Sequence, residues 1–489
     1  MLDTLLIHGQ IVTQDKFRRV ISDGMVGIAG SRIALVAPMD GAPLPQARRV
    51  VDCTGKIILP GLIDGHGHAG HPMTKLISTD SLSYWGRCAE RIYFFWSTPE
   101  FWYYDGLLGG MERLRYGVTT GINVIANEPR ADSLEIVESH AKGYTQTGAR
   151  TIICTGPGSN NWPKPLARWD GQEMKRTTAT WEEYMENTEA LLNTLHLKQD
   201  GLERVFVTPF TIVPSIPTWG KSMPEVTDRL TQFDRMQQKA VVALAKKYKT
   251  NIHTDAFGNG IELMSRSDDP ILGENVLLQH CYDLNWREVQ LVAQTGTNIG
   301  HSPEQSNHFC PFTELLEAGA NAFITSDAPG PRVTFDMFEH MRRAQDLEEL
   351  RFGDYHTLSA QELLDCVTTK AAKAVGMAGE IGSLQEGFQA DVIILDGAAP
   401  HLMGSRPLLE KCVYAASGLD VETVYVNGRL AMEGRRVLGV DESAAVAKAD
   451  QVAKDAARAA GLEAFIHQEP VFGNPYQIFF DTPINFPAL

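Results

Sequence analysis

Three histidines fall within six positions of the stretch GLIDGHGHAGHP, which spans residues 61–72. They are His66, His68 and His71, and they directly follow an apolar run. In an extended segment, side chains two residues apart point the same way, so His66 and His68 can approach one ion together. Imidazole nitrogens suit zinc, and a catalytic zinc keeps one position open for water. The stretch is therefore either part of a catalytic metal centre or a histidine-rich turn.

A metal centre needs ligands from distant parts of the chain, which the fold must bring together. Residues 61–377 hold short apolar runs separated by helical stretches, a pattern typical of βα units around a parallel sheet. With the run before His66, the candidate strands are TGINVIAN, ARTIICTG, RVFVTPFT, TNIHTDA, NVLLQHC, TNIGHSP and NAFITSDAPG. Eight strands favour a (β/α)8 TIM barrel over an open doubly wound sheet. The glycine-rich motifs of nucleotide-binding folds are absent from this stretch, so nucleotide binding has little support.

Several of these strands end in a residue that can bind a metal. The H-x-H pair ends the first strand, His253 the fifth, His280 the sixth and Asp327 the eighth. Catalytic groups of such barrels lie at the carboxyl ends of strands. A single one of these residues is more often structural, but the set occurs in barrel order and favours a metal site.

Both ends of the chain carry short β-like runs, such as TLLIHGQIVT early and VETVYVNGRLAMEG late. We therefore expect the two ends to build one small β-sandwich domain from residues 1–60 and 378–440. The catalytic barrel, residues 61–377, would then be inserted between them.

The last part of the chain, residues 441–489, is predicted to hold a helix and an aromatic tail. Asp441 or Ser443 could cap the alanine-rich helix, and prolines break the segment PVFGNPYQIFFDTPINFPAL that follows. The tail is expected to be a strap across its own domain or a neighbouring subunit, with lining of the active site as the alternative.

Composition limits the function classes. The chain has 489 residues, with 44 Lys plus Arg against 60 Asp plus Glu and a formal charge of −16, which disfavours binding to nucleic acid or anionic lipid. The start MLDTLLIHGQIV lacks an export signal and no apolar run is long enough to span a bilayer, so we expect a cytoplasmic protein. The seven cysteines form no C-x-x-C pair and are expected to be reduced, mostly buried thiols.

Taken together, these motifs resemble those of the metal-dependent amidohydrolase superfamily. More narrowly, the chain is similar to the branch that holds s-triazine hydrolases, cytosine and guanine deaminases and S-adenosylhomocysteine deaminases. The resemblance rests on LPGLIDGHGH, on NVLLQHCYDLNWREVQLVAQTGTNIGHSPEQSN and on LLEAGANAFITSDAPG. It covers nearly the whole chain, including the β segments before residue 60 and after residue 380.

The resemblance implies that His66, His68, His253 and Asp327 hold one divalent metal ion, most readily zinc, with iron, manganese and cobalt as alternatives. The catalytic residues would be His280 and Asp327. Binuclear relatives use a carboxylated lysine on the fourth strand, but RVFVTPFTIVPS contains no lysine, which favours one metal. In this mechanism Asp327 takes a proton from the metal-activated water, and His280 polarises the substrate carbonyl or passes a proton on.

One departure from the branch bears on the substrate. Its deaminases carry a glutamate three residues after the fifth-strand histidine, a position that is Ala256 here. Without that acid, deamination of an aromatic ring loses a proton donor, whereas an amide, urea or carbamate already has a polarised carbonyl. The resemblance extends to phenylurea and thiocarbamate hydrolases. Asp255 could compensate by contacting the substrate, or it could pair with the scaffold.

The loop after the first strand is the expected source of specificity. Compared with relatives, AGHPM is a short insertion that carries His71, which we expect to contact the substrate. The following segment, residues 82–104, is rich in aromatic residues and includes Trp85. Part of it is expected to be core or subunit interface, and the rest an apolar lid over the substrate. Thr98 and Pro99 have the pattern of a helix start.

The seventh-strand motif GHSPEQSN supplies the remaining candidates. His301, Ser306 and Asn307 resemble the substrate-side residues of the family, and His301 and Asn307 are predicted to position the substrate. Ser306 and Asn307 could instead cap the following turn.

Three functions remain open at this point. The preferred one is a hydrolase that cleaves a non-peptide C–N bond in a small amide-, urea- or carbamate-like molecule. The second is deamination or dehalogenation of a nitrogen heterocycle at the same site. The third is a scaffold that has lost its metal. The expected partners are a small-molecule substrate and further copies of the chain, because the aromatic tail suggests a homo-oligomer.

Overall fold

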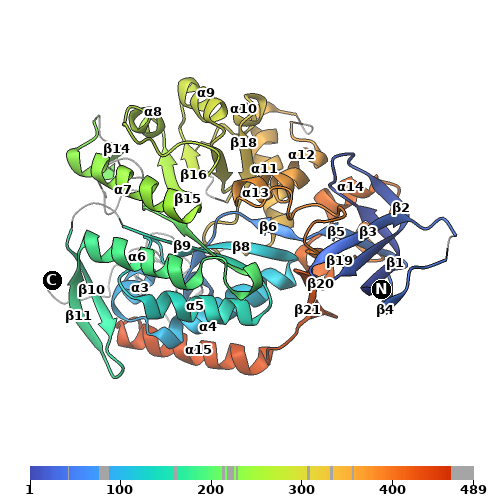
Figure 1. Ribbon diagram of the computed structural model, residues 1–489, viewed down its shortest axis with the longest axis horizontal. Coiled ribbons are helices and arrows are strands. Elements are labelled where there is room, and N and C mark those ends of the chain that lie inside the picture. Colours follow the sequence, from blue (N-terminus) through green and yellow to red (C-terminus); the bar gives the residue numbers. More distant parts are fainter. Residues whose placement is uncertain are drawn as a thin grey trace, which may run out of the picture.

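The computed structural model describes residues 1–41, 43–75, 77, 88–158, 162–211, 215–216, 225–226, 229–304, 309–330, 334–354 and 357–463. Two large sheets organise the chain, one in the middle and one at the right of the view in Figure 1. One is the parallel sheet of the barrel, and the other is an antiparallel-rich sheet made by both ends of the chain.

The parallel sheet forms the predicted TIM barrel. Its spatial order is β18-β17-β16-β15-β12-β9-β8-β6, with the short strand β7 paired to β8. The strands are β6 (Leu62–Asp64), β7 (His68–Ala69), β8 (Val118–Ile125), β9 (Arg150–Thr155), β12 (Glu203–Val207), β15 (Ile252–Phe257), β16 (Val276–Tyr282), β17 (Asn298–His301) and β18 (Asn321–Ile324). All eight runs expected from the sequence are strands of this sheet. Most of their residues are buried, as expected for strands covered on both faces.

The barrel closes between its first and last strands. The backbone N–H of Asp327 donates to the carbonyl of His66 at 2.9 Å, and Gly67 and Asp327 form a parallel bridge. This seam lies at the carboxyl ends of β6 and β18, so it brings together residues that are 261 positions apart.

Helices surround the barrel in the order expected of βα units (Figure 1). The longer ones are α4 (Pro99–Arg115), α5 (Leu134–Gln146), α6 (Trp181–Leu195), α7 (Gln232–Tyr248), α9 (Trp286–Thr295) and α11 (Met337–Phe352), and the shorter ones are α1 (His71–Thr74), α3 (Glu90–Phe95), α8 (Gly260–Met264), α10 (Phe312–Glu317), α12 (Ala360–Cys366) and α13 (Thr369–Ala374). The predicted start of α4 is confirmed, because the Thr98 side chain accepts a hydrogen bond from the N–H of Phe101. The hairpin β10 (Lys164–Trp169) and β11 (Met174–Ala179) extends from the loop after β9.

The second sheet joins the two chain ends, as the sequence predicts. Its order is β22-β21-β20-β19-β5-β1-β2-β3, with β4 paired to β1. The early strands are β1 (Leu2–Val12), β2 (Val20–Ala29), β3 (Arg32–Pro38), β4 (Ala47–Asp52) and β5 (Lys56–Pro60), and the late ones are β19 (Val392–Asp396), β20 (Val421–Val426), β21 (Arg429–Glu433) and β22 (Arg436–Val437). Strands β5 and β19 pair antiparallel and join the early part to the late part.

The described part of the C-terminal segment is the helix α15 (Glu442–Ala459), which packs along α4. Of the two predicted caps, Asp441 is the one that accepts a hydrogen bond, from the N–H of Ala444. The aromatic tail lies outside the described residues. All seven cysteines are buried free thiols, which confirms their interpretation.

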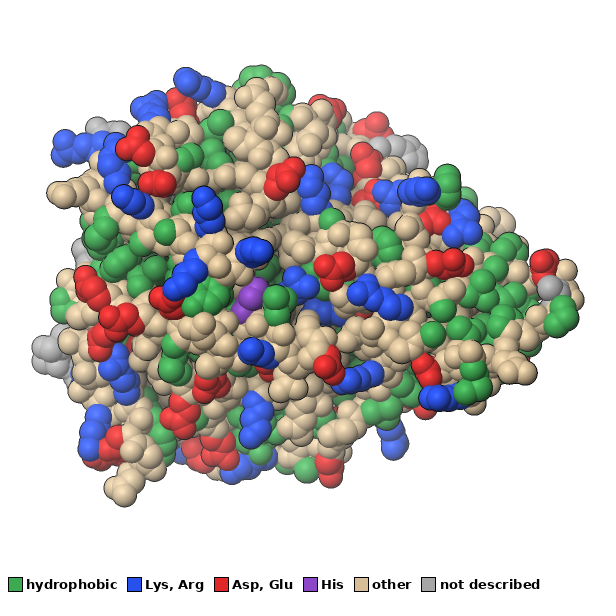
Figure 2. Space-filling model, viewed as in Figure 1, with side chains coloured by type: hydrophobic (Ala, Val, Ile, Leu, Met, Phe, Trp, Pro, Cys, Tyr) green, Lys and Arg blue, Asp and Glu red, His purple; other side chains and the backbone are tan. Residues whose placement is uncertain are grey.

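The surface is mixed in charge. Acidic and basic side chains are interspersed over the face shown in Figure 2. Within the described ranges, no helix combines the length and the apolar character that a membrane crossing requires.

Candidate metal centre and active site

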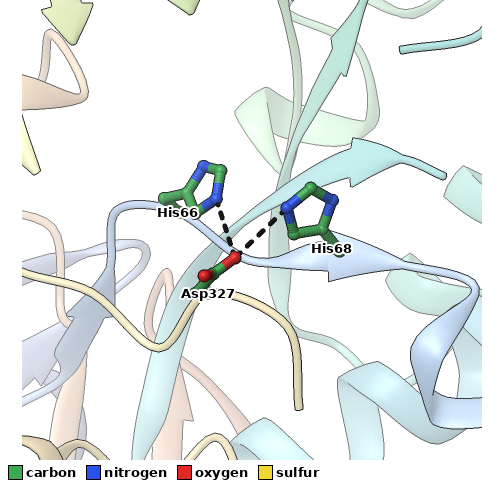
Figure 3. Close-up of side chains that lie close together, drawn as sticks. All are labelled: His66, His68 and Asp327. Carbon is green, nitrogen blue, oxygen red and sulfur yellow. Dashed lines mark hydrogen bonds and ion pairs between the residues drawn. The ribbon is translucent and has the colours of Figure 1, made fainter. Parts of the chain in front are cut away.

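The H-x-H pair meets the end of the last barrel strand. One oxygen of Asp327, Oδ1, lies 3.2 Å from Nε2 of His66 and 3.2 Å from Nε2 of His68 (Figure 3). The side chains of all three residues are almost completely buried. The two-residue spacing of the histidines thus directs both rings to one carboxylate oxygen, as the strand geometry predicts.

Two further histidines join this group from the fifth and sixth strands. Nε2 of His253 lies 2.8 Å from Nδ1 of His66, and the two rings stack with centroids 4.9 Å apart. The centroid of the His280 ring lies 5.7 Å from that of His66. The four predicted ligands and His280 are therefore side by side at one end of the barrel.

Asp255 also faces this group. Its Oδ1 lies 3.8 Å from Nε2 of His280, and the donor atoms of His66, Asp255 and His280 lie within 4.8 Å of one another. Because His253 and Asp255 are two residues apart on β15, they share the face that points into the barrel. Ala256, the position of the missing glutamate, belongs instead to the hydrophobic core.

The protonation of these groups suits cation binding. Burial alone raises the pKa of Asp327, but its hydrogen bonds with His66 and His68 outweigh that effect and hold the pKa well below its ordinary value. Burial lowers the pKa of His66 and His253, and it lowers that of His280 to about 3. Burial alone lowers the pKa of His68, but its hydrogen bond with Asp327 outweighs that effect and raises it. The centre therefore offers an ionised carboxylate and neutral imidazoles at His66, His253 and His280, and His68 would give up its proton when a metal binds.

The orientation of His68 supports the same conclusion. Its Nδ1 lies 2.8 Å from the carbonyl oxygen of Ala126, to which it donates. In the neutral ring this bond places the proton on Nδ1 and leaves the lone pair of Nε2 facing Asp327. Asp327 favours a proton on this nitrogen, and a bound metal ion would take the place of that proton. His66, His68 and Asp327 offer donor atoms within 4.8 Å of one another, so these residues fit a metal ion.

A buried ion pair between Arg113 and Asp64 lies next to the H-x-H pair. Nη2 of Arg113 donates to Oδ2 of Asp64 at 2.7 Å, and both side chains are fully buried. Ser326 donates to the same carboxylate through its hydroxyl, at 2.7 Å, and through its backbone N–H, at 3.0 Å. A Cβ atom at Gly67 would lie 2.3 Å from Nη2 of Arg113. A side chain between the two histidines would therefore displace the Arg113 guanidinium from Asp64, which also binds Ser326, the neighbour of Asp327.

The backbone adopts unusual conformations at three points of the centre. Asp327, His280 and Ala126 have φ values of 60°, 70° and 67°. Non-glycine residues rarely adopt this left-handed region, and such positions cluster at functional sites. The pairing of β15 with β16 shifts register between Ala256 and Phe257, which re-aims the end of β16 where His280 lies.

The predicted substrate contacts have different environments. His71 begins α1 and is fully buried, with Nε2 3.1 Å from Oδ1 of Asn127 and its ring 5.6 Å from that of His68. His301 is buried at the end of β17 against the ring of Phe312, 4.8 Å away. Trp85, Ser306 and Asn307 lie outside the described residues.

Sequence reasoning missed a polar group beside His71. It consists of Glu90 on α3, Asn127 and Glu128 after β8, and Lys164 at the start of β10. Asn127 and Glu128 follow a barrel strand directly, so the rule that selected His253 and Asp327 would have found them. Glu90 carries no such signal, because it lies within an aromatic segment.

Comparisons with known proteins agree with this geometry. Residues 57–431 match the amidohydrolase family. The chain is 26% identical over 454 residues to a 5-methylthioadenosine/S-adenosylhomocysteine deaminase of Syntrophobacter fumaroxidans, covering 90% of this chain and 95% of that protein. It is 25% identical over 467 residues to a 5'-deoxyadenosine deaminase of Methanosarcina mazei, covering 93% and 98%.

Solved structures share the fold. A zinc-bound adenosine deaminase from Xanthomonas campestris superimposes with a TM-score of 0.77 at 21% identity, covering 94% of this chain and 99% of that one. A zinc complex of atrazine chlorohydrolase from Arthrobacter aurescens gives 0.76 at 18% identity, covering 92% and 100%.

Proposed function

The chain belongs to the amidohydrolase family and is a hydrolase of carbon–nitrogen bonds other than peptide bonds, and from this premise we propose its substrate class and its catalytic residues. The proposed substrate is a small amide-, urea- or carbamate-like molecule. The proposed metal ligands are His66, His68, His253 and Asp327. The observation that carries the proposal is the convergence of His66, His68 and Asp327, whose donor atoms lie within 4.8 Å of one another.

The metal is proposed to be one divalent ion per subunit. Zinc is favoured because imidazole and carboxylate suit it and because two structural neighbours contain it, with iron, manganese and cobalt as alternatives. When bound, such an ion lowers the pKa of a coordinated water towards neutrality and polarises a carbonyl oxygen.

The chain's own residues supply the proton transfers. Asp327 is ionised and accepts a proton from the attacking water while the water oxygen bonds to the substrate carbonyl carbon. His280 is neutral and donates a hydrogen bond to the carbonyl oxygen, where negative charge develops. The proton on Asp327 then passes to the leaving nitrogen, the C–N bond breaks, and a neutral amine departs. His71, Trp85, Asp255, His301 and Asn307 are proposed to position the substrate.

A second candidate function uses the same centre. The relatives named above are deaminases, and Asp255 places a carboxylate 3.8 Å from His280, so deamination of a nitrogen heterocycle has support. Against it stands Ala256, where deaminases of the branch carry a glutamate and where this chain has a core alanine. We therefore prefer the amide, urea or carbamate, with the deaminase or dehalogenase as the alternative.

Two measurements test the proposal. Metal analysis of the purified protein should find about one equivalent of a divalent ion; less than about a tenth, with no activity restored by zinc, manganese or cobalt, would contradict the metal centre. A panel of ureas, amides and carbamates should be hydrolysed in preference to purines, pterins and triazines. Ammonia release from the heterocycles with inert ureas would establish the alternative. The cytoplasmic location and homo-oligomeric state remain predictions, the latter measurable by light scattering.

A further inference from the structure

A pocket at the other end of the barrel has no part in the chemistry described above. Its volume is about 660 Å³, within the usual range of small-molecule sites. Its walls are one face of α5, the end of α6 and the turn that leads into β12. Glu203, the first residue of β12, lines the pocket, so the pocket lies at the amino ends of the barrel strands. The metal centre lies at the carboxyl ends, which are on the opposite side of the barrel.

The two helices give the pocket a wall and a favourable field for positive charge. Glu138, Lys142 and Thr145 are spaced four and three residues apart, so they share one face of α5. The helices α5 and α6 lie side by side on the outside of the barrel (Figure 1). Both end at this pocket, α5 at Gln146 and α6 at Leu195. The carboxyl end of a helix carries partial negative charge and favours a cation.

The interior of the pocket holds a carboxylate that has little contact with the rest of the protein. Glu203 is 5% exposed, and its Oε1 accepts a hydrogen bond from the Thr145 hydroxyl at a long 3.4 Å. An ionised carboxylate can accept about four hydrogen bonds. Burial raises the pKa of Glu203 and the bond from Thr145 opposes that shift, whereas no cation of the described chain contributes. An ammonium group in the pocket would supply the missing positive partner.

Two lysines at the rim carry the opposite charge. Lys142 and Lys198 line the pocket and are exposed, and neither forms an ion pair with any described residue. Asp200, also at the rim, is occupied elsewhere, because its carboxylate pairs with Arg429 of β21 at 2.7 Å. The rim therefore offers positive charge, and the interior offers negative charge.

This distribution of charge excludes two simpler ligands. In the part of the chain that the structure describes, Glu138, Asp200 and Glu203 do not bring three donor atoms within 4.8 Å of one another, so they do not form a compact metal site. A free anion such as phosphate would be repelled by the buried carboxylate of Glu203. A molecule with an ammonium group at one end and a carboxylate at the other matches both parts of the pocket.

We propose that this pocket binds a small organic zwitterion, with its ammonium group at Glu203 and its carboxylate at Lys142 and Lys198. Amino acids belong to this chemical class. The inference is independent of the proposed function, because none of these residues is a proposed metal ligand or substrate contact.

Three probes of equal chain length test the site: 5-aminopentanoate, pentylammonium and pentanoate. They carry both charges, the positive charge alone and the negative charge alone. Calorimetric titration of the metal-loaded protein at about pH 8, where amines and carboxylates are ionised, measures their affinities. The wild type should bind 5-aminopentanoate about tenfold or more tightly than pentanoate, as expected for a hydrogen bond to a buried charged group. Its advantage over pentylammonium should be about threefold, because exposed ion pairs contribute less.

Two variants separate the two ends of the ligand. Glu203→Gln removes the charge and should weaken 5-aminopentanoate and pentylammonium by about tenfold or more, with pentanoate within about twofold of the wild type. The double variant Lys142→Gln/Lys198→Gln should weaken 5-aminopentanoate by about threefold and bind pentylammonium no more weakly than the wild type. Glu186→Gln is the matched control, because Glu186 is an exposed glutamate of α6 outside the pocket, and it should keep all three affinities.

Several results would overturn the inference. They are equal affinities of the wild type for the three probes, tightest binding of pentanoate, and unchanged binding of 5-aminopentanoate by the double lysine variant. An affinity for 5-aminopentanoate that survives Glu203→Gln would also overturn it, because the probe would then bind elsewhere, for example through its carboxylate at the metal centre. Circular dichroism checks the folding of each variant. The lysine substitutions change only exposed side chains, so they test the carboxylate end even if Glu203→Gln does not fold.

Discussion

Gly67→Ala should weaken the metal centre while leaving both neighbouring histidines in place. The new Cβ would lie 2.3 Å from Nη2 of Arg113, against 3.4 Å or more for an ordinary contact, so the guanidinium must move by about 1 Å. A shift of that size stretches its 2.7 Å bond to Asp64 beyond hydrogen-bonding distance. Breaking a fully buried ion pair costs about 3–5 kcal/mol, which lowers the folding equilibrium constant by roughly 100- to 4,000-fold.

The same shift should reach the metal. Asp64 is hydrogen-bonded to Ser326, the residue before Asp327, so a displaced Asp64 disturbs both the H-x-H pair and the last strand. Loss of such supporting contacts lowers metal affinity by about 10- to 100-fold. Urea unfolding measures the stability change, and competition against a chromophoric zinc chelator measures the affinity. Ser326→Ala removes one hydrogen bond to Asp64 and should give a smaller loss in both assays.

Gly109→Ala is the matched control. Gly109 lies within α4, and a Cβ there would meet Pro72 at an ordinary 3.4 Å. Alanine at this helical position should leave metal affinity unchanged and alter stability by less than about 1 kcal/mol, most simply as a gain. If Gly67→Ala keeps the wild-type urea midpoint and a metal affinity within about twofold, the supporting role of Arg113 is refuted.

Four further substitutions should have measurable effects. The pKa of Glu90 is raised from 4.5 to about 7, so its stabilising contribution is present below about pH 4.5 and is lost as the pH rises through 7. Between pH 5 and 8 the free energy of unfolding of the wild type, measured by urea titration, should therefore fall by up to about 3 kcal/mol relative to that of Glu90→Gln. His66→Ala should abolish metal binding in elemental analysis, whereas His71→Ala should leave the metal and alter substrate affinity; metal loss in the His71 variant would contradict the assignment. Arg150→Ala should lower the free energy of unfolding by about 3–5 kcal/mol, because it leaves the buried Asp391, which directly precedes β19, without its ion-pair partner. An unchanged urea midpoint would refute this.

The strand ends of the barrel could be predicted because they obey local rules. Each apolar run has the length of a buried strand, and Asp327 follows the end of β18 by three positions. The expectation that His253 ends the fifth strand is wrong, because β15 continues from Ile252 to Phe257 and His253 is its second residue. The alternation of side chains along a strand also accounts for Asp255, which shares the inner face with His253. These inferences needed only spacing and the rule that barrel sites lie at carboxyl ends.

The environment of His71 could not be predicted in this way. Its insertion forms α1, and the ring is buried beside Tyr93 of α3 and Asn127 of the turn after β8. Whether a loop residue is exposed depends on which distant helix covers it, and no periodicity in AGHPM contains that information. In the aromatic segment, Tyr93 and Trp102 are core residues, which agrees with the expectation that part of this segment is core.

The same limit applies to the supporting ion pair. Arg113 lies in the last turn of α4, where basic residues are favoured by the helix dipole, yet its side chain is fully buried next to the H-x-H pair. A buried arginine is explained by its partner, Asp64, which lies 49 positions away in the sequence. Pairing over such a distance is set by the packing of α4 against the barrel, which only the three-dimensional structure reveals.

The closure of the barrel at His66 and Asp327 also sets the order of events on the ribosome. These residues are 261 positions apart, and synthesis at roughly 5–20 residues per second separates their appearance by roughly 13–50 s. During this interval the nascent chain carries an unpaired edge at β6 and two histidines that lack their carboxylate. The hydrogen bond from the N–H of Asp327 to the carbonyl of His66 ends this interval. The proposed set of four ligands is therefore complete only after the last strand has been synthesised.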